Sequence, residues 1–385
     1  MAYVSDAMFA QTVADRRWLH AHPEVGFDLE DTAAYVRARL DDCGVGWEDC
    51  GRCGVIAQIG DCSGDRPVVA LRADMDALPV QEASGVPFAS VNPGKMHACG
   101  HDSHTATLLT VARILKSMED RLPCGVRLIF QPSEECEISG AKMMVENGAV
   151  DGVRLVLGMH CENALEVGKV GVHAGDYMAA CVPVNIAFFG RPAHASMPQL
   201  GVDAVAMAVR AYEAMKRAVA EEAGDRRYIW SVGCFHGGTA HNVIPDRCDL
   251  VVSFRYFDQA FADRALQRVK AVCHEIAGEM GGRAEVAWHV SAPPVINDEA
   301  VAERFRRAAE AHGLPVTDLP SRMSSEDFSW YLSRCPGAIF RFGTRNEALG
   351  CTALAHRADF RIDESGMRAA AEAIVAFVLS DPTGR

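Results

Sequence analysis

The stretch VRLIFQPSEE, residues 126–135, decides the fold class of this chain. A nearly continuous apolar run is followed at once by polar residues and a pair of glutamates, which is typical of a strand buried on both faces of a sheet. The segments VIAQIG (55–60), PVVALRADMD (67–76) and VRLVLGMH (153–160) have the same character, and helical patterns such as TAAYVRARL (32–40) alternate with them. We therefore predict an α/β fold with a doubly wound, mixed sheet.

Polar side chains gather at the ends of these predicted strands. Asp74 and Asp76 follow one strand, Glu134 and Glu135 follow another, and His160 closes a third. In open α/β sheets, ligands bind beyond the carboxyl ends of the strands, so we expect these side chains to lie close together. Asp74 and Asp76 are expected to shape the strand end and its turn rather than to bind metal.

The pattern changes between residues 180 and 292. Strand-like and helical segments there follow the order β-α-β-β-α-β, which is the pattern of a ferredoxin-like module. The α/β alternation resumes after the prolines of SAPPVIND (291–298). We predict a catalytic domain built from residues 1–179 and 293–385, with residues 180–292 as an inserted ferredoxin-like domain.

Composition excludes several classes of protein. The formal net charge is −13 and no run of Lys or Arg forms a basic stripe, which argues against nucleic acid as a partner. No segment approaches 18 uninterrupted apolar residues, and the first 20 residues lack the pattern of a secretion signal, so neither a membrane span nor export is expected. The 14 cysteines are scattered along the chain, which favours buried thiols in a reducing compartment and hence a cytoplasmic protein.

The segment HACGHDSHTA, residues 97–106, points to metal binding. Cys99 and His101 are one residue apart, so a thiolate and an imidazole can face one ion, and this donor pair suits zinc or a related divalent metal. Two ligands do not hold a catalytic metal, so further ligands must come from distant segments. Glu135, His160 and His356 would complete a set of one sulfur, three nitrogens and a carboxylate, enough for two ions.

The adjacent glutamates of QPSEE allow a division of labour. Neighbouring side chains diverge, so one carboxylate can bind metal while the other acts as a base toward water, as metal-assisted hydrolysis requires. Each signal also has a purely structural interpretation. The acidic pair suits the first turn of a helix, and His160 and His356 could be ordinary histidines at a strand end and in a loop.

Taken together, the motifs resemble a known family. In chain order they are HAHPEVGF (20–27), RADMDALP (72–79), HACGHDSHTA (97–106), QPSEE (131–135), GMH (158–160), GRPAHASMP (190–198), GGTAHNVIPD (237–246), SSEDF (324–328), PGAIFRFG (336–343) and AHRADFRIDE (355–364). This series resembles the M20 metallopeptidase superfamily, and most of all its amidohydrolase branch, which includes hippurate hydrolases, N-acyl-amino-acid deacylases and auxin-conjugate hydrolases. The resemblance covers nearly the whole chain.

The resemblance implies a site with two divalent ions, of zinc, manganese, cobalt or nickel. The implied ligands are Cys99, His101, Glu135, His160 and His356. Glu134 is implied as the general base that takes a proton from the attacking water and later delivers it to the leaving amine. Asp102 is a candidate for orienting the imidazole of His101.

The inserted module has implied roles of its own. The resemblance implies that it closes over the site and forms a homodimer, or a tetramer built from dimers. His194 would stabilise the oxyanion, in its own site or in the partner's site in the dimer, and Asn242 and Arg255 would hold the carbonyl or carboxylate of the substrate. A forked guanidinium is well suited to grip a carboxylate.

The expected activity is hydrolysis of N-acyl amino acids to a carboxylate and a free amino acid. A dipeptidase or carboxypeptidase with the same two-metal chemistry is the first alternative. A metal-free hydrolase with Cys99 as nucleophile is a second, and a non-catalytic metal-binding protein with an idle Glu134 is a third. Ser103 and the segment 136–138 depart from the family pattern, so substrate choice is expected to differ from that of familiar members.

Overall fold

The structure is a computed structural model that describes residues 2–63 and 66–383. Within them the chain divides into two compact units. The large unit comprises Met1–Tyr177, Ile296–Ser321 and Asp327–Arg385, apart from the undescribed residues, and the small unit comprises Met178–Val295 and Arg322–Glu326. Among the described residues, no helix is both long enough and apolar enough to cross a membrane.

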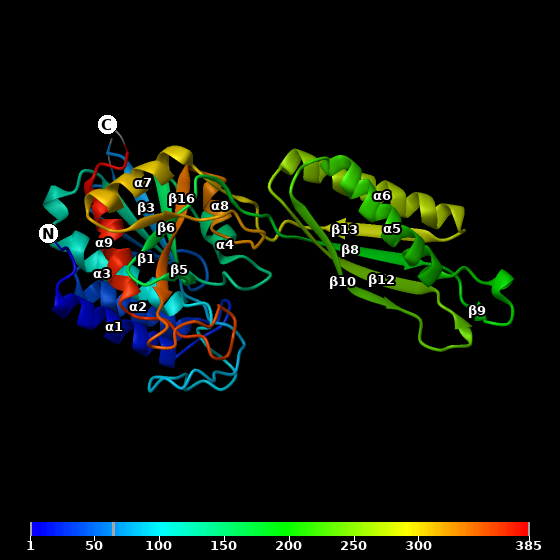
Figure 1. Cartoon of the computed structure of the whole chain (residues 1–385), viewed down its shortest axis with the longest axis horizontal. Helices are drawn as coiled ribbons and strands as arrows, with labels where there is room; N and C mark the ends of the chain where they lie inside the picture. Colours follow the sequence, from blue (N-terminus) through cyan, green and yellow to red (C-terminus); the bar gives the residue numbers. More distant parts are fainter. Residues whose placement is uncertain (1, 64–65, 384–385) are drawn as a thin grey trace. The chain divides into compact units, whose positions relative to one another are not determined.

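The large unit is built on a mixed sheet that has eight strands in the described part of the chain, in the order β1-β2-β4-β3-β5-β16-β6-β15 (Figure 1). The strands are Trp47–Asp49 (β1), Val55–Ile59 (β2), Val68–Asp74 (β3), Gly125–Gln131 (β4), Val153–Glu166 (β5), Val170–Val172 (β6), Val316–Asp318 (β15) and Gly337–Arg345 (β16). At its centre β3 runs parallel to β4 and β5, and β16 runs parallel to β5. The predicted α/β class with a mixed sheet is confirmed.

Helices cover both faces of this sheet. They are Asp6–Ala21 (α1), Glu30–Asp42 (α2), His101–Ser117 (α3), Gly140–Glu146 (α4), Glu299–Ala311 (α7), Ser329–Leu332 (α8) and Gly366–Leu379 (α9). One core cluster joins α1, α2, α3, α7 and α9 to alternate residues of the strands. The intervening residues face α4 and α8, as Gly158 does against the ring of Phe328.

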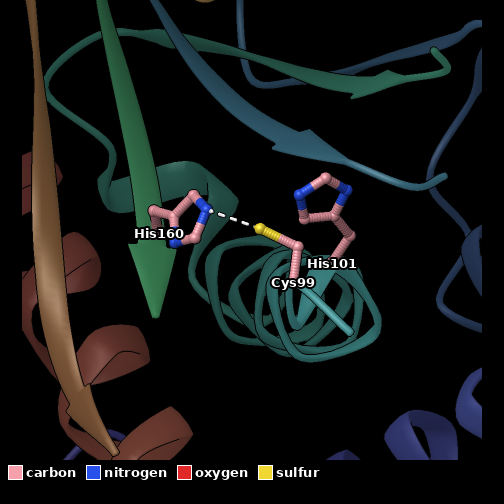
Figure 2. Close-up of side chains that lie close together, drawn as sticks. All are labelled: Cys99, His101 and His160. Carbon is pink, nitrogen blue, oxygen red and sulfur yellow. Dashed lines mark hydrogen bonds between the residues drawn. The ribbon is translucent and has the colours of Figure 1, made fainter. Parts of the chain in front are cut away.

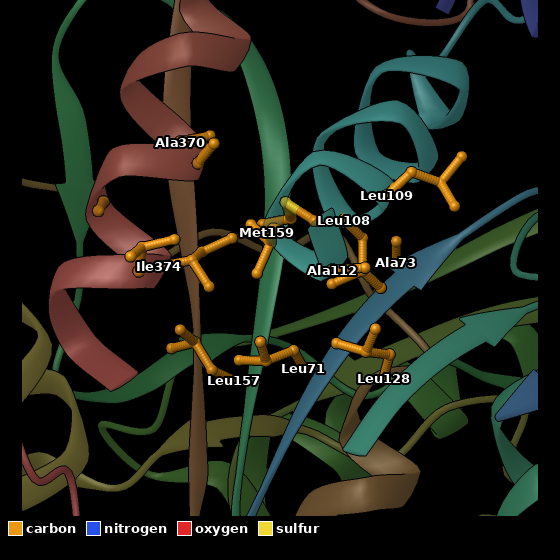
Figure 3. Close-up of a cluster of buried hydrophobic side chains, with 14 of the residues drawn as sticks. Leu71, Ala73, Leu108, Leu109, Ala112, Leu128, Leu157, Met159, Ala370 and Ile374 are labelled. Atoms are coloured by element: carbon orange, nitrogen blue, oxygen red, sulfur yellow. The ribbon is translucent and has the colours of Figure 1, made fainter. Parts of the chain in front are cut away.

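The main core explains why the central strands carry apolar residues along their whole length. All seven residues of β3 are buried. Figure 3 shows Leu71, Leu128 and Leu157 from three neighbouring strands beneath the side chains of α3 and α9. Because side chains of a strand alternate between faces, this layer accounts for half of each strand, and the other half packs against the second face.

The small unit has a separate core. Its main elements are Val182–Phe189 (β8), Ala204–Ala223 (α5), Tyr228–Gly237 (β10), Arg247–Tyr256 (β12), Gln259–Glu279 (α6) and Arg283–Trp288 (β13). The strands form an antiparallel sheet in the order β10-β12-β8-β13, and α5 and α6 pack on one of its faces (Figure 1). Asp203 and Asp258 cap these two helices by accepting backbone N–H groups of Ala206 and Phe261.

Short elements complete the described chain. Ala193–His194 (β9) pairs with Val243–Ile244 (β11), and Gly175–Met178 (β7) pairs with Val295–Asn297 (β14). Two turns of 3-10 helix lie at Glu119–Arg121 and Pro198–Leu200.

Candidate metal centre

The parallel strands of the large unit bring distant polar residues to one edge of the sheet. Residue Asp74 ends β3, the glutamate pair follows the end of β4, and His160 lies in β5 beside them. Helix α3 begins at the same edge, with Cys99 just before it and His101 as its first residue. The expected convergence of these side chains is therefore observed, but the prediction that His160 closes its strand is wrong, because β5 continues to Glu166 in its pairing with β16.

The predicted ligands of the large unit form overlapping groups. Ligand atoms lie within 4.8 Å of one another in three sets, which are Cys99 with His101 and His160, Cys99 with Glu135 and His356, and His101 with Glu134 and Glu135. Figure 2 shows the Cys99 thiol between the two imidazoles, with Sγ 3.3 Å from His160 Nε2. His356 Nε2 lies 3.1 Å from Glu135 Oε1. Six side chains that are spread over more than two hundred residues of sequence thus meet at one place.

The charges of this cluster suit a cation. Both ring nitrogens of His101 are buried and have no hydrogen-bond partner among the described residues. Burial lowers the pKa of His101, but the negative charges of Asp74, Asp76 and Glu135 outweigh this effect and raise the pKa to about 10. A buried imidazole surrounded by carboxylates is in the environment that a divalent ion would neutralise.

The pKa values of the Cys99 thiol and the His160 imidazole also fit a metal site. Burial and the nearby Glu135 carboxylate raise the pKa of Cys99 well above its usual range. Burial lowers the pKa of His160 well below its usual range, so its ring stays neutral and keeps a lone pair for an ion. Sulfur, nitrogen and carboxylate donors in this combination fit zinc and its transition-metal neighbours.

Asp76 holds the glutamate pair in place. Its two carboxylate oxygens accept the backbone N–H groups of Glu134 and Glu135, at 2.9 and 3.0 Å. Ser133, just before the pair, has a φ of 53°, and His356 has a φ of 70°. Such left-handed conformations are costly for residues other than glycine and concentrate at functional sites, so both segments are held in shape by their surroundings. Asp76 thus shapes the turn that follows β4, whereas its expected role at the end of its own strand, β3, stays a prediction.

Asp102 has a different role from the one expected. Its Oδ2 accepts from Arg16 Nε at 2.7 Å and lies 2.8 Å from His20 Nδ1. His101 instead faces Asp76, with Nδ1 3.4 Å from Oδ1. The prediction that Asp102 orients His101 is therefore wrong, because the carboxylate is already engaged on the far side of α3 by α1.

A buried network beneath the loop of Glu134 and Glu135 was not predicted from the sequence. The guanidinium of Arg72 donates to Asp74 Oδ2 (2.7 Å), Gln131 Oε1 (2.8 Å) and Asp327 Oδ1 (3.0 Å). Asp327 also accepts the Ala141 N–H at the start of α4. The only signal in the sequence was a charged residue inside the apolar run VVALRAD.

The other predicted site residues lie in the small unit. His194 is exposed in β9, opposite Val243 of β11, and the carbonyl of Asn242 accepts the Ala195 N–H. Arg255 lies in β12 and donates from Nη1 to the Met323 carbonyl at 3.1 Å. Their roles toward a substrate stay predictions.

Comparison with known proteins places the chain in a family. Residues 70–380 match Peptidase family M20/M25/M40. The chain belongs to this family. Its resemblance to the M20 superfamily, and with it the prediction of a hydrolase that acts on linear amides, is confirmed.

Three similar proteins illustrate the match. An N-acetyl-L-cysteine deacetylase of Bacillus subtilis (strain 168) is 37% identical over 360 residues, which is 93% of this chain and 85% of the relative. Thermostable carboxypeptidase 2 of Saccharolobus solfataricus is 33% identical over 376 residues, 95% of this chain and 94% of the relative. The solved structure of the Bacillus subtilis YXEP protein, described as a dinuclear metal binding peptidase from the M20 family, has a TM-score of 0.86 at 31% identity and matches over 98% of this chain and 99% of that one.

Proposed function

We propose that this M20 hydrolase cleaves the amide bond of N-acyl amino acids and releases a carboxylate and a free amino acid. The observation that carries the proposal is the cluster of Cys99, His101, Glu135, His160 and His356, with the second glutamate beside it. The similarity to an N-acetyl-L-cysteine deacetylase supports the substrate class.

The five clustered side chains are the proposed ligands of two divalent ions, of zinc, manganese, cobalt or nickel. Such ions polarise the amide carbonyl and lower the pKa of a bound water. Glu134 takes a proton from the attacking water and passes it to the leaving nitrogen, so that the amine departs neutral. This assignment is supported by the two hydrogen bonds of Asp76, which fix the backbone of both glutamates. With the backbone fixed, the two carboxylates can point in different directions, one toward the metal and one toward the water.

The small unit carries the rest of the proposal. Residues 180–292 form a lid and dimerisation domain of a homodimer or of a tetramer built from dimers, in which His194 stabilises the oxyanion and Asn242 and Arg255 hold the substrate's carbonyl or carboxylate. We also propose that the protein acts in the cytoplasm, because all 14 of its cysteines are free thiols.

A substrate screen tests the proposal. Protein loaded in turn with each of the four metals is incubated with N-acetyl, N-benzoyl and indolylacetyl amino acids, and the released amine is measured. We expect turnover of at least one of these substrates, and a loss of roughly a thousandfold or more in kcat for Glu134→Gln with both ions retained, because only the base is removed. The matched control is Glu146→Gln, an exposed glutamate of α4, which should keep full turnover. Full turnover by Glu134→Gln would contradict the mechanism.

The second candidate is a carboxypeptidase or dipeptidase, which the 33% identity to thermostable carboxypeptidase 2 favours. The same screen includes unblocked dipeptides. Faster release from those than from every N-acylated substrate would establish the peptidase instead.

The metal-free cysteine hydrolase has little support. A nucleophilic thiol needs a lowered pKa, whereas burial raises the pKa of Cys99 well above its usual range. A chelator should therefore abolish turnover, and activity that survives complete metal removal would revive this alternative.

A further inference from the structure

His104 lies next to the proposed ligands and is assigned no role by the proposed function. It is fully buried in the first turn of α3, one turn after His101. The centre of its ring lies 4.6 Å from that of His160 and 5.3 Å from that of His101. A histidine in this place could be a further ligand, a packing residue or a positioning residue.

The hydrogen bonds of His104 define its tautomer. Its Nε2 accepts the backbone N–H of Cys161 at 2.8 Å, and its Nδ1 lies 2.5 Å from Asp74 Oδ1. A backbone N–H can only donate, so Nε2 carries no proton and the ring proton is on Nδ1, where it is donated to the carboxylate. Both nitrogens are engaged, so His104 has no lone pair left for an ion.

The partner of His104 is the residue that follows His160. Cys161 uses its N–H for His104, and its carbonyl oxygen lies 2.6 Å from His160 Nδ1. His160 therefore donates from Nδ1 to that carbonyl, which leaves the lone pair of Nε2 directed at the Cys99 thiol. The backbone of one residue, Cys161, thus links the two imidazoles.

The other partner of His104 is tied to the network beneath the site. Asp74 Oδ2 accepts from Arg72 Nη1 at 2.7 Å and lies 3.7 Å from His101 Nε2. The carboxylate therefore cannot turn freely, and His104 connects a fixed group at the end of β3 to the backbone of β5.

We propose that His104 is a positioning residue, which joins Asp74 to the Cys161 backbone and so holds His160 at the correct place relative to Cys99 and His101. The inference rests on the metal centre of the proposed function. It predicts that the acceptor at Nε2, not merely the volume of the ring, is what the site requires.

Two substitutions separate the two hydrogen bonds. His104→Gln places an amide oxygen near the position of Nε2 and keeps an acceptor for Cys161, whereas His104→Asn keeps a donor near Nδ1 and loses that acceptor. The matched control is Thr107→Val, which removes an equally buried hydrogen bond of α3, from Oγ1 to the Ser103 carbonyl at 2.7 Å, away from His160.

The readout is cobalt binding to the full chain, measured as ion affinity and as the visible and thiolate-to-cobalt absorption of the bound metal. We expect His104→Asn to weaken binding of at least one ion by about 10- to 100-fold and to change the spectrum. His104→Gln should recover most of the affinity and the spectrum, and Thr107→Val should leave both unchanged although it unfolds at lower urea. Equal affinity and identical spectra for the Gln and Asn variants would overturn the proposal.

A measurement on the unchanged protein decides the matter if either variant does not fold. Two-dimensional ¹⁵N–¹H NMR of histidine-labelled protein, with and without metal, should show His104 as the neutral tautomer with the proton on Nδ1. A proton on Nε2 would overturn the proposal. Neither readout involves hydrolysis, so failure to cleave N-acyl amino acids would overturn the proposed substrate but not the proposed role of His104. Failure of the unchanged protein to bind cobalt would overturn the metal centre itself.

Discussion

At the scale of single residues, the site depends on carboxylates that hold other groups in place. Asp76 holds the glutamate loop, Asp74 holds His104, and Asp102 joins Arg16 and His20 behind α3. Each of these acids is buried, and each accepts from at least two donor groups. Burying such a charge is tolerable only when it is paired, so these residues are the points at which substitution is expected to be most damaging.

Glu82 belongs to the same network of charged groups, and its pKa leads to a prediction about how stability depends on pH. Burial raises its pKa, but hydrogen bonds from His20, Ser84 and the Ser90 N–H outweigh this effect and lower the pKa to about 2. Because the folded pKa is below the unfolded one, the carboxylate stabilises the fold above about pH 4.5, and this stability is lost as the pH falls toward 2.

We expect Glu82→Gln to remove the contribution of this carboxylate to the pH dependence of the free energy of unfolding. That contribution is on the order of 2 kcal/mol between pH 5 and 2. The free energy of unfolding is measured by urea titration of metal-free protein across this range. Glu310→Gln, at an exposed position of α7, is the matched control and should follow the unchanged protein. An equally steep loss of stability in Glu82→Gln would contradict the assignment.

The sequence could predict which residues bear the chemistry but not what holds them. Cys99 and His101 are recognisable from their spacing, and Glu134, Glu135 and His160 from their place after apolar runs. The contact between Arg72 and Asp327 spans 255 positions, and no local pattern reports a pair so far apart. Asp102 was misassigned for the same reason, since its partners come from α1.

At the scale of elements, the site is a consequence of parallel strands, because β3 and β4 end beside His160 of β5. The long buried strands β3, β4 and β5 were predictable from their apolar runs. Strands β6 and β15 have three residues each and helix α8 has four, too few to show a period. These short elements are stabilised by packing against the larger ones, so tertiary contacts rather than a local sequence pattern determine them.

The layer beneath α3 gives a stability prediction. Leu71 is 1% exposed in the middle of β3, within the core shown in Figure 3. Leu71→Ala should lower the free energy of unfolding by about 2–5 kcal/mol, because it leaves a cavity that the surrounding strands cannot close.

The same substitution at Leu349, which is 58% exposed, is the matched control and should change the free energy of unfolding by no more than about 0.5 kcal/mol. Chemical denaturation of both variants with metal bound makes the comparison. Similar losses in the two variants would show that the core does not lie where the structure places it.

At the scale of the whole molecule, the chain holds two separate hydrophobic cores, one in each unit. All five proposed ligands belong to the large unit. A ligand stabilises the part of the protein that must be folded to bind it, so metal should stabilise the large unit and not the small one.

Hydrogen exchange followed by mass spectrometry tests this difference. With free metal at about 100 times its dissociation constant, amides of β3, β4 and β5 should exchange about 100-fold more slowly than in chelator-treated protein. Amides of β8 and β12 should exchange at the same rate in both samples. Uniform slowing of both units would contradict the independence of the two cores.

The central claim is that five distant side chains bind two ions beside Glu134. The most direct measurement is an anomalous difference map from a crystal of the zinc-loaded protein, recorded at the zinc absorption edge. The account predicts two peaks, each about 2.0–2.3 Å from ligand atoms drawn from Cys99, His101, Glu135, His160 and His356. A single peak, or peaks remote from the Cys99 thiol, would contradict it.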